Sequence, residues 1–117
     1  MADLEATFRA LRETMEPFAA GLARKTDSDT ELYLEGHLER GKSATFGAVQ
    51  LKKNYVSYHL VPLYTDPDLL GAVSPELKKR MQGKACFNFR TADPALFGQL
   101  AALTGAALER FRQQGHV

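Results

Sequence analysis

The sequence contains one cysteine, no low-complexity run and no long run of apolar residues. A single cysteine cannot form an internal disulfide bond, and it is typical of proteins kept in a reducing compartment. No apolar stretch approaches the roughly 18 residues that a membrane-spanning helix requires. The first residues carry acidic side chains rather than an apolar segment, so we expect no secretory signal. We therefore expect a cytoplasmic protein with no membrane segment.

The 117 residues are about the length of one domain, and 25% of them are charged. The net charge of +1 is unevenly spread, because residues 1–39 hold nine acidic and four basic residues whereas residues 40–117 hold five and eleven. This asymmetry either steers a charged partner or reflects chance variation between short segments. The overall pI of about 7.9 is low for a nucleic-acid-binding domain, so we do not expect a nucleic acid partner.

Apolar periodicity predicts a helix over residues 2–16, with one apolar stripe through Leu4, Phe8, Leu11 and Met15. Pro17 should kink or end this helix, which could then resume as far as about Arg24. Residues 25–30 are polar and predict a turn.

Alternation of apolar and polar residues predicts strands over 31–39, 44–51 and 55–64, joined by tight turns at 40–43 and 52–54. The pairs Asp66-Pro67 and Ser74-Pro75 predict two short helices, with Gly83 ending the second. Residues 84–90 predict a further strand, and Asp93-Pro94 begins the last helix. Gly98 and Gly105 lie on a small-residue face of that helix, where we expect close packing. The prediction is one α+β domain over residues 1–117, a two-layer sandwich whose antiparallel sheet is covered on one face by the N- and C-terminal helices.

The strand at 31–39 carries the strongest candidate metal site. Period two places Glu35, His37 and Glu39 on one face, and carboxylate and imidazole groups suit Fe²⁺ or Zn²⁺. Neighbours two apart on one strand are about 6.5–7 Å distant, so these three need a further ligand from another element. The alternative is an ordinary exposed sheet face.

A second candidate site lies in the aromatic strand at 55–64. His59 is aligned with Tyr55, Ser57 and Val61, whereas Tyr58 points to the other face. We expect a pocket or apolar patch near Tyr55, Tyr58 and His59 that takes a small ligand or a protein partner. An exposed sheet face or edge would also allow a homodimer.

The sequence supplies no arrangement of catalytic residues, so we expect no enzyme. Gly83-Lys84 follows a helix and precedes a strand, which is the reverse of the order in a phosphate-binding loop. Cys86 stands between aromatic residues on a strand, either as an inert half-buried thiol or as a reactive one activated by Lys84.

Three segments in this order resemble the YdhG-like family of small bacterial proteins: FGAVQLKKNYVSYHLVPLY (46–64), SPELKKRM (74–81), and GKACFNF (83–89) followed by an Asp-Pro helix. The resemblance covers roughly residues 30–113 and implies a two-layer fold of α-helices and β-strands. Part of that family resembles frataxin and is described as an iron chaperone, which implies Fe²⁺ binding. Frataxins present iron-binding acids along the first helix; the acids here are Asp3, Glu5, Glu13 and Glu16, with Arg9 and Arg12 between them. Iron handling is thus the expected function, and a non-catalytic binding module is the alternative.

Overall fold

The computed structural model describes residues 3–37, 43–64, 66–83 and 85–117, with the backbone alone for His37 and Ser43. The elements follow one another as α1 (Leu4–Met15), a 3-10 helix (Glu16–Phe18), β1 (Ala23–Asp27), β2 (Glu31–His37), β3 (Ser43–Leu51), β4 (Val56–Leu60), a 3-10 helix (Val61–Tyr64), α2 (Pro67–Gly71), α3 (Pro75–Lys78), β5 (Met81–Gln82), β6 (Cys86–Phe89) and α4 (Pro94–Gln113).

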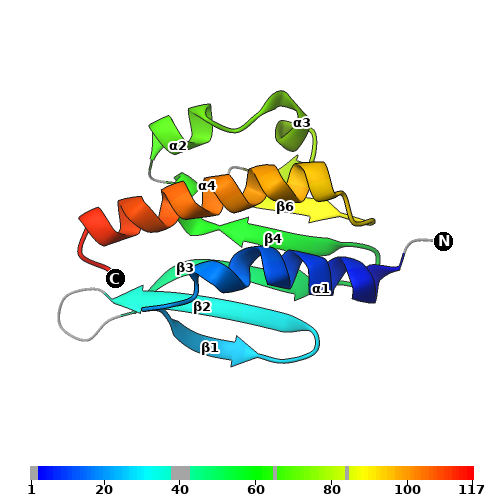
Figure 1. Ribbon diagram of the computed structural model, residues 1–117, viewed down its shortest axis with the longest axis horizontal. Coiled ribbons are helices and arrows are strands. Elements are labelled where there is room, and N and C mark those ends of the chain that lie inside the picture. Colours follow the sequence, from blue (N-terminus) through cyan, green and yellow to red (C-terminus); the bar gives the residue numbers. More distant parts are fainter. Residues whose placement is uncertain (1–2, 38–42, 65, 84) are drawn as a thin grey trace.

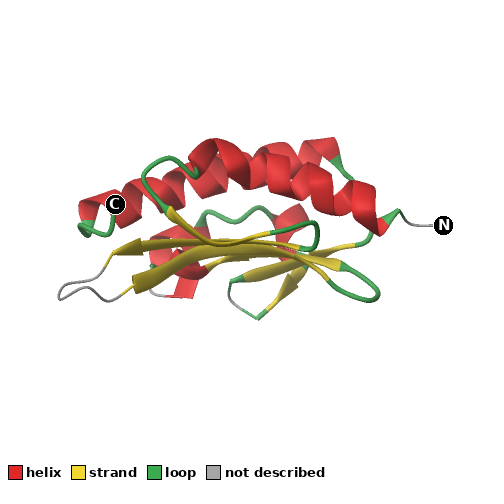
Figure 2. Cartoon of the chain, turned by 90° about the horizontal axis from the view of Figure 1, so that it is seen from below, coloured by secondary structure: helices red, strands yellow, loops and turns green. Residues whose placement is uncertain are grey.

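The strands of the described chain form one antiparallel sheet in the order β1-β2-β3-β4-β6-β5. The long helices α1 and α4 lie side by side across one face of this sheet (Figures 1 and 2). The predicted α+β class and the helical covering of one face are therefore confirmed. The short helices α2 and α3 lie beside α4 (Figure 1), and they and the segment between them bury Leu69, Val73 and Leu77 in the same core. In the described part of the chain, no helix has both the length and the apolar character needed to cross a membrane.

Local sequence explains where the helices begin. The side chains of Asp66, Ser74 and Asp93 accept hydrogen bonds from the first backbone N–H groups of α2, α3 and α4, and each is followed by proline. These three predicted caps are confirmed. Asp3 caps α1 in the same way, by accepting from the amide of Ala6 at 3.0 Å.

The core lies between the helices and the sheet. The apolar stripe of α1 contributes Phe8, Leu11 and Met15, which are at most 3% exposed. Leu32 and Leu34 of β2 meet them from the sheet and are fully buried. Burial of this kind, at about 25 cal/mol per Å² of apolar surface, is the main stabilising contribution in a domain of this size.

Two predictions for the segment after Pro17 were wrong, the helix that continues to about Arg24 and the turn that begins at residue 25. The helix does not resume after Pro17; Ala23–Asp27 forms the edge strand β1, which pairs with β2 through Ala23–Glu35 to Asp27–Leu32. The segment ARKTD is almost wholly exposed and shows no alternation of burial. This segment is extended because it forms hydrogen bonds to β2, and the local sequence pattern of residues 23–27 does not predict that pairing.

The ends of several elements also differ from the predictions. The strand predicted over 55–64 ends at Leu60, because Pro62 lies in a 3-10 helix. Gly83 does not end α3; it adopts a positive φ of 78° in the turn between β5 and β6. Close packing was expected at both Gly98 and Gly105. A Cβ at Gly98 would meet no atom within 4 Å, whereas a Cβ at Gly105 would lie 3.2 Å from the Phe18 ring. The predicted turn residues 40–42, with 38, 39 and 84, lie outside the described residues.

Candidate binding site on the open sheet face

The sheet has two chemically different faces. One packs under α1 and α4 through residues such as Leu32, Leu34 and Tyr58. Strand alternation places the intervening residues on the opposite face, which we call the open face. Its residues include Glu31, Tyr33 and Glu35 of β2, Ala48 and Gln50 of β3, Ser57 and His59 of β4, and Cys86 and Asn88 of β6.

The β1–β2 side of the open face is linked by its own polar contacts. The ammonium group of Lys25 lies 5.2 Å from the centroid of the Tyr33 ring, and the Tyr33 hydroxyl contacts the Thr45 hydroxyl at 2.6 Å. The Gln50 amide donates to the carboxylate of Glu31. The polar groups of Lys25, Tyr33 and Glu31 on this side therefore already have interaction partners within the protein.

The β4–β6 side is different. Cross-strand pairing sets Ser57 opposite Asn88 and His59 opposite Cys86. The Cys86 thiol donates to Oδ1 of Asn88 at 3.5 Å. Burial raises the pKa of this thiol, although a hydrogen bond with Ser57 and the charge of Lys52 oppose the shift. The cysteine is thus a neutral thiol at pH 7, which agrees with the inert alternative.

His59 is the residue on this face whose polar atoms are least satisfied. Its Nε2 atom is buried and has no hydrogen-bond partner in the described structure. Burial lowers the pKa of the imidazole, so the ring is neutral near pH 7. The ring of Tyr64 lies 6.0 Å away between centroids, and Tyr64 is 55% exposed. A buried nitrogen without a partner is unusual in a folded protein and calls for a physical explanation.

The structure separates the three residues predicted to bind a ligand. Tyr58 is fully buried under the helices, where its hydroxyl contacts Thr104 at 2.5 Å. His59 lies on the open face, and alternation with the buried Val56 places half-buried Tyr55 there too. Tyr58 therefore cannot line the same surface as the other two. Sequence reasoning did not assign Asn88 or Tyr64 to the site. The alternation 86–88 could have pointed to Asn88, whereas Tyr64 reaches His59 only because the chain leaves the strand after Leu60.

The metal site predicted in β2 is only partly within the described residues. Glu35 is half-buried on the open face, next to the bulge that β3 forms opposite it. The side chain of His37 and the whole of Glu39 lie outside the described residues. Within the parts of the chain that the structure describes, no group of three or more His, Cys, Asp or Glu side chains is placed to hold a metal ion. The metal site stays a prediction.

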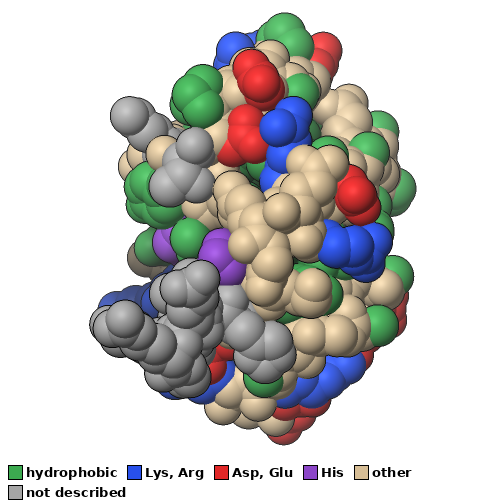
Figure 3. Space-filling view, turned by 90° about the vertical axis from the view of Figure 1, so that its left-hand side faces the viewer, with side chains coloured by type: hydrophobic (Ala, Val, Ile, Leu, Met, Phe, Trp, Pro, Cys, Tyr) green, Lys and Arg blue, Asp and Glu red, His purple; other side chains and the backbone are tan. Residues whose placement is uncertain are grey.

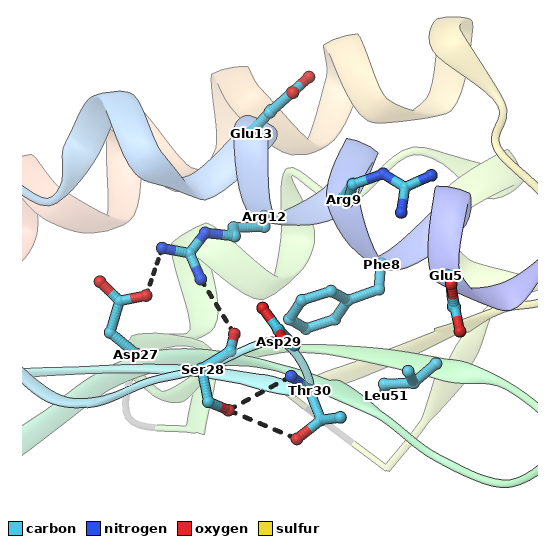
Figure 4. Close-up of a pocket in the computed structure, with 10 residues that line it drawn as sticks. All are labelled: Glu5, Phe8, Arg9, Arg12, Glu13, Asp27, Ser28, Asp29, Thr30 and Leu51. Carbon is cyan, nitrogen blue, oxygen red and sulfur yellow. Dashed lines mark hydrogen bonds and ion pairs between the residues drawn. The ribbon is translucent and has the colours of Figure 1, made fainter.

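A separate concavity of about 700 Å³ lies between α1 and the β1–β2 turn (Figure 4). Arg12 crosses it and donates to the Asp27 carboxylate and, at 3.1 Å, to the carbonyl oxygen of Ser28. Arg24 joins the same network by pairing with Glu16, and this hydrogen bond lowers the pKa of the Glu16 carboxyl. These charged groups connect α1 to the edge strand β1, so we assign them a structural role.

Comparisons with known proteins identified no relative of this chain. Neither a scan against protein-family models nor searches of curated proteins and solved structures gave a match to this chain. Function must therefore be argued from the residues and their arrangement.

Proposed function

We propose that this chain is a non-catalytic binding module whose recognition surface is the β4–β6 side of the open face. The observation that carries the proposal is the buried Nε2 of His59, which lacks a hydrogen-bond partner in the described structure, on a part of the face that also carries the polar residues Ser57, Cys86 and Asn88. A ligand group that reached this nitrogen after movement of the exposed Tyr64 ring would recover a hydrogen bond now missing from the fold.

Binding is favoured over catalysis by the same chemistry. A cysteine nucleophile acts as the thiolate, and burial raises the pKa of Cys86. The neighbouring imidazole is neutral and gives the thiol no positive charge to lower its pKa. The pair His59–Cys86 therefore supports recognition by hydrogen bonds rather than attack on a substrate.

The test is a fragment screen read by NMR on ¹⁵N-labelled protein, with neutral and anionic fragments below about 300 Da. We expect the largest shift changes at the amides of Ser57, His59, Cys86 and Asn88, and their loss in His59→Phe. The matched control is Gln99→Ala, which alters the apolar groove between α3 and α4 and should leave these changes intact. Shift changes gathered around Val73, Leu77 and Leu103 instead would place the binding surface in that groove and contradict the proposal.

Iron handling, the function implied by the family resemblance, is the second candidate. Glu35 favours it, because this half-buried carboxylate on the open face has no hydrogen-bond or ion-pair partner in the described structure. The test is an anaerobic thermal melt with Fe²⁺, using Zn²⁺ and Mg²⁺ as controls. A ligand at about 100 times its dissociation constant adds roughly 2.7 kcal/mol of stability. Iron binding predicts a rise with Fe²⁺ that is reduced in His37→Ala, and no rise with any metal would exclude it.

A further inference from the structure

Cations from separate segments meet at one end of the sheet. Lys52 and Lys53 lie in the β3–β4 turn, and Arg90 directly follows β6, whose last residue Phe89 pairs with Val56 at the start of β4. Arg80 lies across from Asn88, because the Asn88 amide donates to the Arg80 carbonyl oxygen at 2.8 Å. We call Lys52, Lys53, Arg80 and Arg90 the basic end.

The four cations of the basic end are exposed and form no ion pair within the described structure, although Arg80 lines a concavity that also holds Glu76 and Asp93. Arg12 on α1 and Arg24 on β1 differ from these four, because both pair with Glu16 and Asp27. At the opposite end of the molecule, acidic and basic side chains lie next to one another (Figure 3). The overall pI therefore conceals a local positive surface.

Ring side chains lie beside and within β4. Tyr55 directly precedes this strand, and alternation along the chain places it on the same face as His59, four residues or about 13 Å away. Tyr64 continues the row, with its ring 6.0 Å from that of His59. Tyr64 is 55% exposed, so one of its surfaces is accessible to a planar ligand.

The positions between and beside these rings carry polar groups without negative charge. Ser57 and Asn88 face each other across β4 and β6, and Gln82 pairs with Cys86 at the other side of β6. The acidic residues of the described open face, Glu31 and Glu35, belong to β2. A polyanion lying along β4 thus meets hydrogen-bonding groups on β4 and β6, and the whole of β3 separates it from these two carboxylates.

We propose that the ligand of this surface is a short single-stranded nucleic acid. Its bases stack on Tyr55 and Tyr64, its phosphates lie at the basic end, and the half-buried Asn88 contacts a base edge. Accessible bases distinguish a single strand from a duplex, and stacking rings distinguish it from an acidic peptide. This inference rests on the proposed function, because it names the ligand class of the same face.

The experiment is fluorescence anisotropy of labelled ten-nucleotide oligo(U) and oligo(dT) at 50 and 200 mM salt. Tyr55→Leu and Tyr64→Leu should each weaken binding at least about fivefold through lost base stacking. The double variant Lys52→Gln/Lys53→Gln should lower the slope of log affinity against log salt by about 1.4. Lys25→Gln is the matched control, because Lys25 is an exposed cation on the far edge strand, and it should change affinity less than about twofold. Thermal melts verify that each variant is folded.

Three results would overturn the inference. Equal affinity for a ten-base-pair duplex or for polyglutamate of matched charge would mean attraction of any polyanion. Unchanged affinity in both folded tyrosine variants would exclude stacking. Absence of oligonucleotide binding, with NMR shift changes still seen at Ser57, His59 and Asn88 in the fragment screen, would reject the nucleic acid and leave the proposed binding function standing. Absence of both would reject both.

Discussion

The hydroxyl of Tyr58 on β4 donates to Oγ1 of Thr104 on α4 at 2.5 Å, inside the core. The direction follows from the Thr104 proton, which is donated to the Leu100 carbonyl oxygen at 2.7 Å. Both residues are fully buried. This contact attaches the last helix to the centre of the sheet, and burial raises the pKa of the phenol so that it stays protonated at any ordinary pH.

Removing the acceptor should cost more than removing the donor. In Tyr58→Phe, Thr104 keeps its bond to Leu100, so we expect a loss of about 1 kcal/mol. In Thr104→Val, the Tyr58 hydroxyl is left buried without an acceptor, and we expect a loss towards the upper end of about 1–3 kcal/mol. Urea denaturation of both variants measures the difference. An equal or smaller loss in Thr104→Val would contradict the assigned direction of the hydrogen bond.

Two glycines should respond to alanine in opposite directions. Gly98 is at an exposed position of α4 where a Cβ would meet no atom within 4 Å, so Gly98→Ala should stabilise the protein by up to about 1 kcal/mol through helix propensity. A Cβ at Gly36 would lie 2.5 Å from the His116 carbonyl oxygen and 2.7 Å from Cε2 of Phe111, so Gly36→Ala should destabilise it by about 1–3 kcal/mol. Thermal melts of the two variants measure these changes in stability. A lower melting temperature for Gly98→Ala would show that another part of the protein packs against α4 at Gly98.

His59 should make stability fall in mild acid. Its pKa is below 6.5 in the folded state because of burial, so below pH 6.5 the unfolded chain binds a proton that the folded chain does not. Protonation of His59 therefore does not reduce the free energy of unfolding above pH 6.5. This free energy decreases as the pH falls from 6.5 towards the pKa of His59 in the folded state. Melting temperatures measured from pH 7.5 to 5 should show a shallower slope in His59→Gln. Ser57→Ala, beside it on β4, should keep the slope; the same slope in wild type and His59→Gln would exclude His59 as its source.

Cys86 should react slowly in the folded protein. Burial raises the pKa of the thiol and restricts access, and both effects reduce the thiolate available to iodoacetamide at pH 7. We expect alkylation several-fold slower than in the same protein unfolded in guanidinium chloride, followed by mass spectrometry. Lys52→Gln should slow it further, because the charge of Lys52 lowers the thiol pKa. Equal rates in the folded and unfolded protein would indicate a reactive, accessible thiol.

Much of the fold could be predicted from local chemistry. The stripe through Phe8, Leu11 and Met15, the alternation around Leu32 and Leu34, and the Asp-Pro pairs each act within a few residues, where side-chain spacing and backbone hydrogen bonding are read directly from the sequence. The α+β class follows from them. The separation of Tyr58 from His59 onto opposite faces was likewise visible in the alternation of the strand.

Tertiary structure alone decided the features that depend on a distant partner. Ala23–Asp27 is extended because β2 supplies its hydrogen bonds, and Gly98 is exposed because no element packs over it within the described chain. The basic end exists because antiparallel pairing brings the β3–β4 turn to the end of β6 and Arg80 to Asn88. The physical reason is the same in each case. The hydrogen-bond partners of a strand and the net charge of a surface depend on which segments are neighbours in the folded protein. The spacing of residues along the chain does not determine which segments become neighbours.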